Sequence, residues 1–133
     1  DPVSGPVAKK ILCIEDEAGM RDLLRLILEA EGYVCLHAEN GVEGLEKMRQ
    51  EQPDLVLLDL MLPELDGAGV LLQQKEDPEI RDIPVIAVTA LSSPFDQLMW
   101  RRRTEIKAYV TKPFVRKELL KTIAQALAEE SDA

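Results

Sequence analysis

The sequence has too few basic residues for a nucleic-acid-binding protein. Its 133 residues include 16 Lys and Arg against 25 Asp and Glu, which gives a formal net charge of −9. Binding to DNA or RNA depends on basic side chains that neutralise phosphates. We therefore expect no direct contact with nucleic acid.

The sequence also lacks long apolar runs. No stretch approaches the roughly 20 apolar residues that a membrane-spanning helix needs, and the opening DPVSGPVAKK has no apolar core of a secretory signal. These absences predict a cytoplasmic protein without membrane contact. The chain begins at Asp1, and residues 1–8 are expected to be a flexible segment, either a cloning remnant or the end of a linker.

Cysteine is scarce. Cys13 and Cys35 both lie in apolar runs that resemble strands, so we interpret them as reduced, buried thiols without a chemical role.

The remaining sequence is typical of one α/β domain. With 46% hydrophobic residues, the chain can bury one ordinary core and is too short for two. Short aliphatic runs alternate with longer stretches of helical spacing, which is the pattern of strands and helices around a parallel sheet. The predicted strands are 9–15, 33–39, 54–59, 83–90 and 107–113. The third and fourth are apolar on both faces and are therefore predicted to be central.

Five helices follow from the spacing of apolar residues. The first has the clearest apolar face and should end at Gly32. That face consists of Met20, Leu23, Leu24, Ile27 and Leu28. The apolar residues Val42, Leu45 and Met48 indicate a second helix, and a third is predicted over residues 67–75. The Ser93-Pro94 pair is a start signal for a fourth helix, and the apolar residues between 119 and 127 indicate a fifth.

Polar residues stand at the carboxyl ends of four of the predicted strands. They are Glu15, Asp16 and Glu17 after the first strand, Asp59 after the third, Thr89 in the fourth and Lys112 in the fifth. The carboxyl ends of parallel strands meet at one edge of a sheet, where ligands bind. Converging carboxylates repel one another unless a cation neutralises them, and their oxygen ligands suit Mg²⁺ or Mn²⁺. One carboxylate can then attack a phosphoryl donor while Lys112 absorbs negative charge.

Two other kinds of phosphate site are disfavoured. The first strand is followed by EDEAGM, with three acids in a row instead of a glycine-rich loop, which argues against a flavin carrier or a P-loop enzyme. Phosphatases with an aspartyl nucleophile, of the haloacid-dehalogenase kind, need a second Asp two positions on, and this chain has Met61 there. Taken singly, Asp16 could be a helix cap, Asp59 a turn residue and Thr89 an ordinary strand residue.

From Lys9 to about Leu127 the chain resembles the receiver domain of two-component response regulators. Glu15 and Asp16 match its acidic pair, and DLMLPELDG matches its phosphoacceptor loop with Asp59 as the acceptor. Thr89-Ala90 and the segment from Tyr109 to Phe114 match its switch strand and its closing segment. The resemblance implies a flavodoxin-like, doubly wound sheet of five parallel strands in the order 2-1-3-4-5 with five helices. The domain is expected at 9–128, with a tail at 129–133.

The resemblance also implies roles for the site residues. Asp16, Asp59 and the carbonyl of Met61 would hold Mg²⁺ or Mn²⁺, with Glu15 acting mostly through water. Lys112 would contact the phosphoryl group, Thr89 would move to hydrogen-bond it, and Tyr109 would swing inward with Thr89. The bond between Lys112 and Pro113 is expected to be cis.

The function implied is that of a switch phosphorylated by a sensor histidine kinase or a phosphotransfer protein, without turnover of a separate substrate. An output partner, or a second copy in a homodimer, would bind the face made by the fourth helix, the fifth strand and the fifth helix. Trp100 falls off the apolar side of the fourth helix, so we expect it to be exposed and, with Arg101, Arg102 and Arg103, to contribute to such a surface. A phosphorylation-independent interaction module and an aspartyl phosphatase stay as alternatives.

Two apolar residues predict a long-lived acyl phosphate. Met61 stands two positions after Asp59, and Leu91 stands two positions after Thr89. Neither side chain can orient an attacking water by hydrogen bonding. We therefore expect slow hydrolysis.

Overall fold

The computed structural model has one five-stranded parallel sheet in the order β2-β1-β3-β4-β5. It describes residues 8–62, 65–90, 93–103 and 105–131. The strands are β1 (Lys10–Ile14), β2 (Val34–Ala38), β3 (Leu55–Leu58), β4 (Val85–Thr89) and β5 (Ala108–Thr111). The helices are α1 (Ala18–Ala30), α2 (Gly41–Glu51), α3 (Gly67–Glu76), α4 (Pro94–Arg103) and α5 (Arg116–Ser131). The predicted fold, strand order and number of elements are confirmed.

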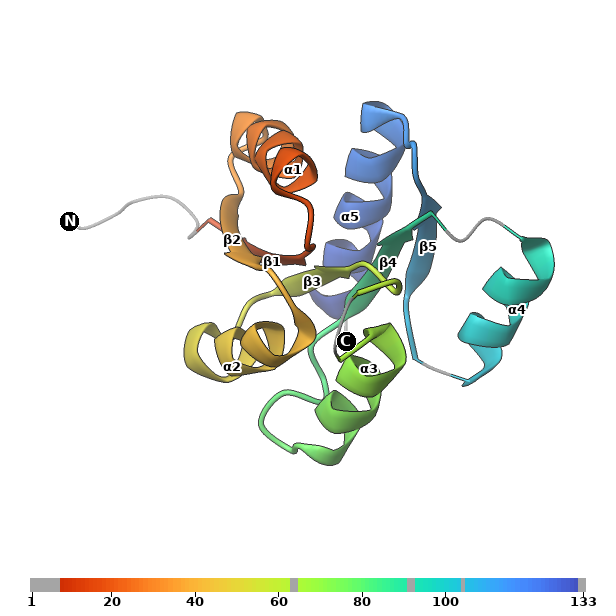
Figure 1. Ribbon diagram of the computed structural model, residues 1–133. Helices are drawn as coiled ribbons and strands as arrows, with labels where there is room; N and C mark the ends of the chain where they lie inside the picture. The colour runs from red at the N-terminus through yellow and green to blue at the C-terminus, as the bar shows by residue number, and fades with distance from the viewer. Residues whose placement is uncertain (1–7, 63–64, 91–92, 104, 132–133) are drawn as a thin grey trace.

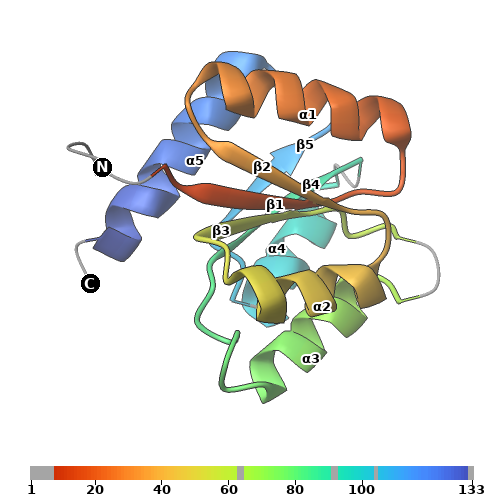
Figure 2. The ribbon, with the colours of Figure 1, turned by 90° about the vertical axis from the view of Figure 1, so that its left-hand side faces the viewer.

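Helices cover both faces of the sheet. α1 and α5 lie on one face, and α2, α3 and α4 lie on the other (Figures 1 and 2). Because successive strand residues point to opposite faces, Leu12 and Ile14 of β1 belong to the core under α2, whereas Ile11 and Cys13 belong to the core under α1 and α5. The two cores are thus separated by the sheet itself.

The predicted burial of the strands is confirmed, with one addition. β3 and β4 are buried at every position, as their two-sided apolar sequences predict. β1 is also flanked by strands on both sides and is buried from Ile11 to Ile14. β2 is an edge strand, and Val34 at its start is 42% exposed.

The apolar helix faces are narrower than the spacing predicts. In α1 the buried residues are Leu24, Ile27 and Leu28, whereas Leu23 is 43% exposed. In α2, Val42 is 52% exposed, so its assignment to the buried face was wrong. The buried residues of α2 are Gly41, Gly44, Leu45 and Met48, and Val42 lies outside this face.

Glycine and polar caps define the ends of the first two helices. Gly32 has a φ of 88°, a conformation that costs glycine little, and it follows α1 as predicted. Asn40 caps α2 by accepting a hydrogen bond from the Glu43 amide at 2.9 Å. α5 continues to Ser131, into the segment expected as a tail. Within the described residues, none of the helices has the length and apolar character needed to cross a membrane.

Candidate functional site

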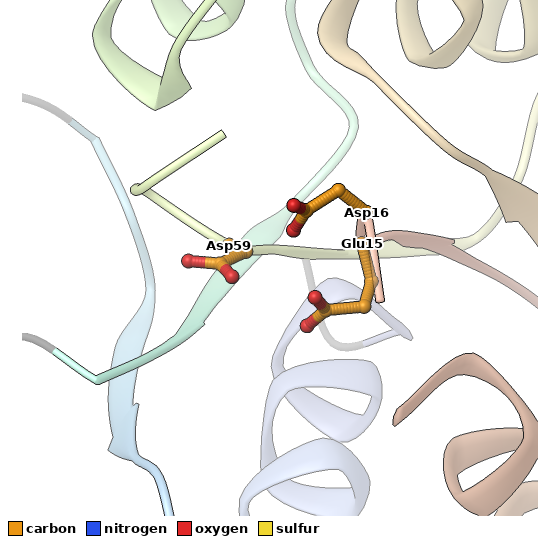
Figure 3. Close-up of side chains that lie close together, drawn as sticks. All are labelled: Glu15, Asp16 and Asp59. Carbon is orange, nitrogen blue, oxygen red and sulfur yellow. The ribbon is translucent and has the colours of Figure 1, made fainter. Parts of the chain in front are cut away.

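Three side chains from two strand ends form a cluster of carboxylates. Glu15 and Asp16 follow β1, and Asp59 follows β3, whose last residue, Leu58, is in register with Ile14 of β1. Figure 3 shows the three side chains close together, and one oxygen of each lies within 4.8 Å of the others. The sheet edge thus gathers the acids that the sequence placed at strand ends.

The cluster fits a hard divalent cation. It is the one group in the described part of the chain that brings three His, Cys, Asp or Glu donors so close. All its donors are carboxylate oxygens, the ligands that Mg²⁺ and Mn²⁺ prefer. Glu15 and Asp59 are buried, whereas Asp16 is exposed, so the cluster is open to solvent on one side.

Lys112 connects β5 to this cluster. Its Nζ lies 2.5 Å from Glu15 Oε1 and 3.0 Å from Asp59 Oδ2. Its backbone amide donates to the Thr89 carbonyl at 2.8 Å, which ties the ends of β4 and β5 together. The Lys112-Pro113 bond is cis, as the resemblance predicted.

Burial and pairing have opposite effects on these charges. Burial raises the pKa of Glu15 above its usual range, although the ammonium of Lys112 counteracts part of the rise. Burial lowers the pKa of Lys112, but hydrogen bonds to Glu15 and Asp59 outweigh it, and the net shift is upward. Lys112 therefore stays charged at neutral pH and neutralises part of the cluster.

Local hydrogen bonds orient the acidic residues. Asp59 Oδ1 accepts a hydrogen bond from the Met61 amide at 2.9 Å, as expected for a turn residue. Its other oxygen, Oδ2, accepts a hydrogen bond from Lys112, so Asp59 does more than hold the turn. Glu15 Oε2 accepts the Glu17 amide at 3.2 Å. The N-cap of α1 is Glu17, and its side chain makes no capping hydrogen bond, so the capping interpretation of Asp16 was wrong.

The direct pairing of Glu15 with Lys112 was not anticipated. The resemblance implied a role through water for Glu15, whereas the structure buries Glu15 and places it against the ammonium group. The signal was present in the sequence, since both residues stand at the carboxyl end of a predicted strand. Their contact required knowing how the strand ends meet.

Thr89 lies at the end of β4 with an unsatisfied hydroxyl. Thr89 is fully buried, and its Oγ1 has no hydrogen-bond partner among the residues that the structure describes. An unsatisfied buried polar group costs free energy, so this hydroxyl is available to a further acceptor at the sheet edge.

Tyr109 and Trp100 both pack against the core on the α2 side. Tyr109 is half-buried in β5, and burial raises its pKa, with smaller contributions from Asp96 and Asp59. Trp100 is also half-buried there, so the prediction of an exposed Trp was wrong: α4 turns this side chain toward the core. Arg102 is exposed, whereas the side chains of Arg101 and Arg103 lie outside the described set.

Met61 and Leu91 were the basis of the predicted slow hydrolysis. The Met61 side chain is 57% exposed beside Asp59. Leu91 lies outside the described residues.

Comparisons with known proteins agree with this geometry. The family model of the response regulator receiver domain matches residues 11–124. The polar-differentiation response regulator DivK of Brucella anthropi is 37% identical over 121 residues, which cover 91% of this chain and 98% of DivK.

Solved structures show the same fold. The signal receiver domain of a histidine kinase from Syntrophus aciditrophicus is 33% identical, covers 92% of each chain and has a TM-score of 0.82. A CheY-like receiver domain protein from Methanospirillum hungatei is 31% identical, covers 95% of this chain and 98% of the other, and has a TM-score of 0.83.

Receiver domains are signalling switches that are phosphorylated on an aspartate, bind Mg²⁺ in an acidic site, and interact with histidine kinases or phosphotransfer proteins and with output partners. The sheet order, the acidic cluster and the family match lead to the same assignment: the chain belongs to the response regulator receiver domain family.

Proposed function

We propose that this chain is a phosphorylation-activated switch in which Asp59 accepts a phosphoryl group from a sensor histidine kinase or a phosphotransfer protein. The observation that carries the proposal is the position of Asp59, which stands between two other carboxylates and the ammonium of Lys112. Pairing to Lys112 and to the Met61 amide leaves Asp59 fixed in orientation at the sheet edge.

Glu15, Asp16, Asp59 and the main-chain carbonyl of Met61 are the proposed holders of Mg²⁺ or Mn²⁺. When bound, the ion supplies charge neutralisation on the transferring phosphoryl oxygens. Asp16 is exposed to solvent, and Glu15 contributes its negative charge from the buried side.

The remaining steps belong to the side chains of the protein. An Asp59 carboxylate oxygen attacks phosphorus in line with the leaving group of the donor, and a phosphorus–oxygen bond to Asp59 replaces the bond to the donor. Lys112 donates hydrogen bonds to the new phosphoryl oxygens in place of its present bond to Asp59. The unsatisfied Thr89 hydroxyl donates to another phosphoryl oxygen, which gives this buried group the partner it lacks among the described residues.

Phosphorylation then acts on binding. The new group adds negative charge and acceptor oxygens, Thr89 moves toward it, and Tyr109 follows into the space that Thr89 leaves. An alternative arrangement of the face formed by α4, β5 and α5 becomes more populated and binds an output partner or a second copy. The functional unit is residues 9–128, it acts in the cytoplasm, and it turns over no separate substrate.

The test is phosphorylation by a small acyl-phosphate donor. Incubation with Mg²⁺ and acetyl phosphate should add one phosphoryl group by intact mass, and the Asp59→Asn variant should stay unlabelled. Asp22→Asn is the matched control, because Asp22 is exposed and pairs with Arg25 of its own helix at 3.1 Å. Equal labelling of the wild type and of Asp59→Asn would refute the assignment of the acceptor.

The same experiment separates the two alternatives. An interaction module would show no labelling with any donor. A phosphatase would release phosphate from a phosphomonoester in steady turnover, which the proposed switch does not do.

A further inference from the structure

Two cysteines and a histidine form a second cluster, on the α1-covered side of β1 and β2. Cys13 Sγ lies 3.8 Å from Cys35 Sγ, and Cys35 Sγ lies 3.8 Å from His37 Nε2. Cys13 and His37 are register partners, and Cys35 stands two residues before His37, so all three point to the same side of the sheet. The proposed phosphorylation chemistry uses none of them.

The cluster is not a three-ligand metal site. In the described part of the chain, the acidic cluster is the one group of three such donors within 4.8 Å, so Cys13 and His37 do not converge on a common centre. What the geometry offers is a pair of sulfur atoms in contact, with an imidazole beside one of them. Both thiols are free.

Cys35 is the accessible member of the pair. It lies half-buried in the edge strand β2, whereas Cys13 is completely buried in β1. A small oxidant therefore reaches Cys35 first. The hydrogen bond from Cys13 also lowers the pKa of Cys35, which favours the reactive thiolate.

We propose that Cys13 and Cys35 are a peroxide-sensitive pair that closes to a disulfide and thereby slows phosphorylation of the neighbouring acidic site. A disulfide has an S–S length of about 2.05 Å, so the sulfur atoms must approach by about 1.8 Å from their present separation of 3.8 Å. In the proposed disulfide, rotation of the two side chains and a shift of β1 against β2 bring the sulfur atoms together.

The chemistry is balanced with hydrogen peroxide as the oxidant. The Cys35 thiolate attacks one peroxide oxygen, the O–O bond breaks, and hydroxide leaves after His37 or solvent has taken the thiol proton. Cys13 sulfur then attacks the sulfenic sulfur of Cys35, the S–O bond breaks, and the Cys13 proton leaves with the hydroxyl group as water. Two thiols and one peroxide give one disulfide and two waters.

Backbone hydrogen bonds connect this pair to the acidic cluster. The residue after Cys13 is Ile14, whose carbonyl accepts the Asp59 amide at 3.1 Å. The next amide, that of Glu15, donates to the Ala38 carbonyl at the end of β2 at 3.0 Å. A shift of β1 against β2 therefore changes how Glu15 and Asp16 stand relative to Asp59. Misplacement by about 1 Å costs up to about 100-fold in rate in such sites.

The first measurement tests the disulfide itself. The full chain is treated with hydrogen peroxide and analysed by intact mass and by non-reducing peptide mapping. The expected product has lost two hydrogen atoms, links the Cys13 and Cys35 peptides, and is restored by dithiothreitol. Oxidation of the exposed Met61 would add an oxygen atom instead, so the two reactions differ in the sign of the mass change.

Two variants keep the disulfide test decisive. Cys35→Ser should lose the reaction, and Cys13→Ser should leave Cys35 to gain oxygen without a cross-link. Two free thiols in the treated wild type, counted after denaturation, would overturn the proposal.

The second measurement tests the coupling, which rests on the proposed function. Labelling by acetyl phosphate and Mg²⁺ is timed for reduced, oxidised and re-reduced protein, and oxidation should slow it by roughly tenfold in a reversible way. Treated Cys35→Ser should label at its untreated rate. A disulfide that leaves the rate unchanged would overturn the coupling, whereas failure of the reduced protein to label would count against the proposed function and not against the disulfide.

Discussion

Replacing Lys112 with Met is expected to destabilise the metal-free protein strongly. The substitution removes the charge and keeps most of the apolar stem, so packing changes little. It leaves Glu15 and Asp59, which are 2% and 7% exposed, without the ammonium that lies 2.5 and 3.0 Å from their oxygens. Removing one partner of a buried ion pair costs about 3–5 kcal/mol.

The lower end of that range is the appropriate magnitude here. Each of the two carboxylates keeps a backbone hydrogen bond, from Glu17 to Glu15 and from Met61 to Asp59. We therefore expect a loss of about 3 kcal/mol. At about 2.1 cal/mol/K per residue, the 133 residues have an unfolding entropy of about 0.28 kcal/mol/K. The corresponding fall in Tm is about 11 °C.

The assay is thermal unfolding in EDTA and in Mg²⁺. Lys107→Met is the matched control, because Lys107 pairs with Glu130 at 3.5 Å and the two side chains are 42% and 36% exposed. An exposed pair contributes under about 1 kcal/mol, so the control should lose no more than about 4 °C. Mg²⁺ should raise the Tm of Lys112→Met more than that of the wild type, because the ion and Lys112 neutralise the same carboxylates.

Two results would refute this reasoning. Equal losses of Tm for the Lys112 and Lys107 variants in EDTA would mean that burial does not strengthen the Lys112 pairs. Equal gains from Mg²⁺ in the variant and the wild type would mean that Lys112 and the cation do not share the acidic cluster.

Three further predictions concern other residues. Met61→Asn should shorten the lifetime of the acyl phosphate, because an amide can orient the attacking water, and faster decay in the wild type would contradict this. His37→Gln should flatten the pH dependence of Tm. Burial, then nearby Arg and Lys charges, lower the pKa of His37, so the wild type is most stable above pH 6.5 and loses stability as pH falls through the lowered pKa. An equal slope of Tm against pH in the variant would contradict this assignment. Gly44→Ala should cost about 1–3 kcal/mol in denaturant unfolding, because its Cβ would stand 2.5 Å from Ile14 Cδ1, whereas Gly19→Ala, with nothing within 4 Å, should be neutral or stabilising.

The class of fold follows directly from local sequence patterns. Runs that are apolar at every position, such as that of β3, have to be covered on both faces, and helical stripes such as that of α1 supply the cover. The strand order came from the family resemblance, because apolar pattern does not say which strands are neighbours. The exposure of Val42 and the burial of Trp100 could not be predicted, because both depend on what packs beside the helix.

Some features of the candidate site likewise follow from the sequence, and others depend on the tertiary structure. The sequence by itself determined that Glu15, Asp16, Asp59, Thr89 and Lys112 each stand at the end of a strand, because strand ends are set by local pattern. Only the tertiary structure decided that Lys112 bonds to two carboxylates at once and that Glu15 is buried. It also decided that the Thr89 hydroxyl is left without a partner in the described region, and that two cysteines 22 residues apart touch. These features depend on distances between segments far apart in the chain, which are fixed by the register of neighbouring strands.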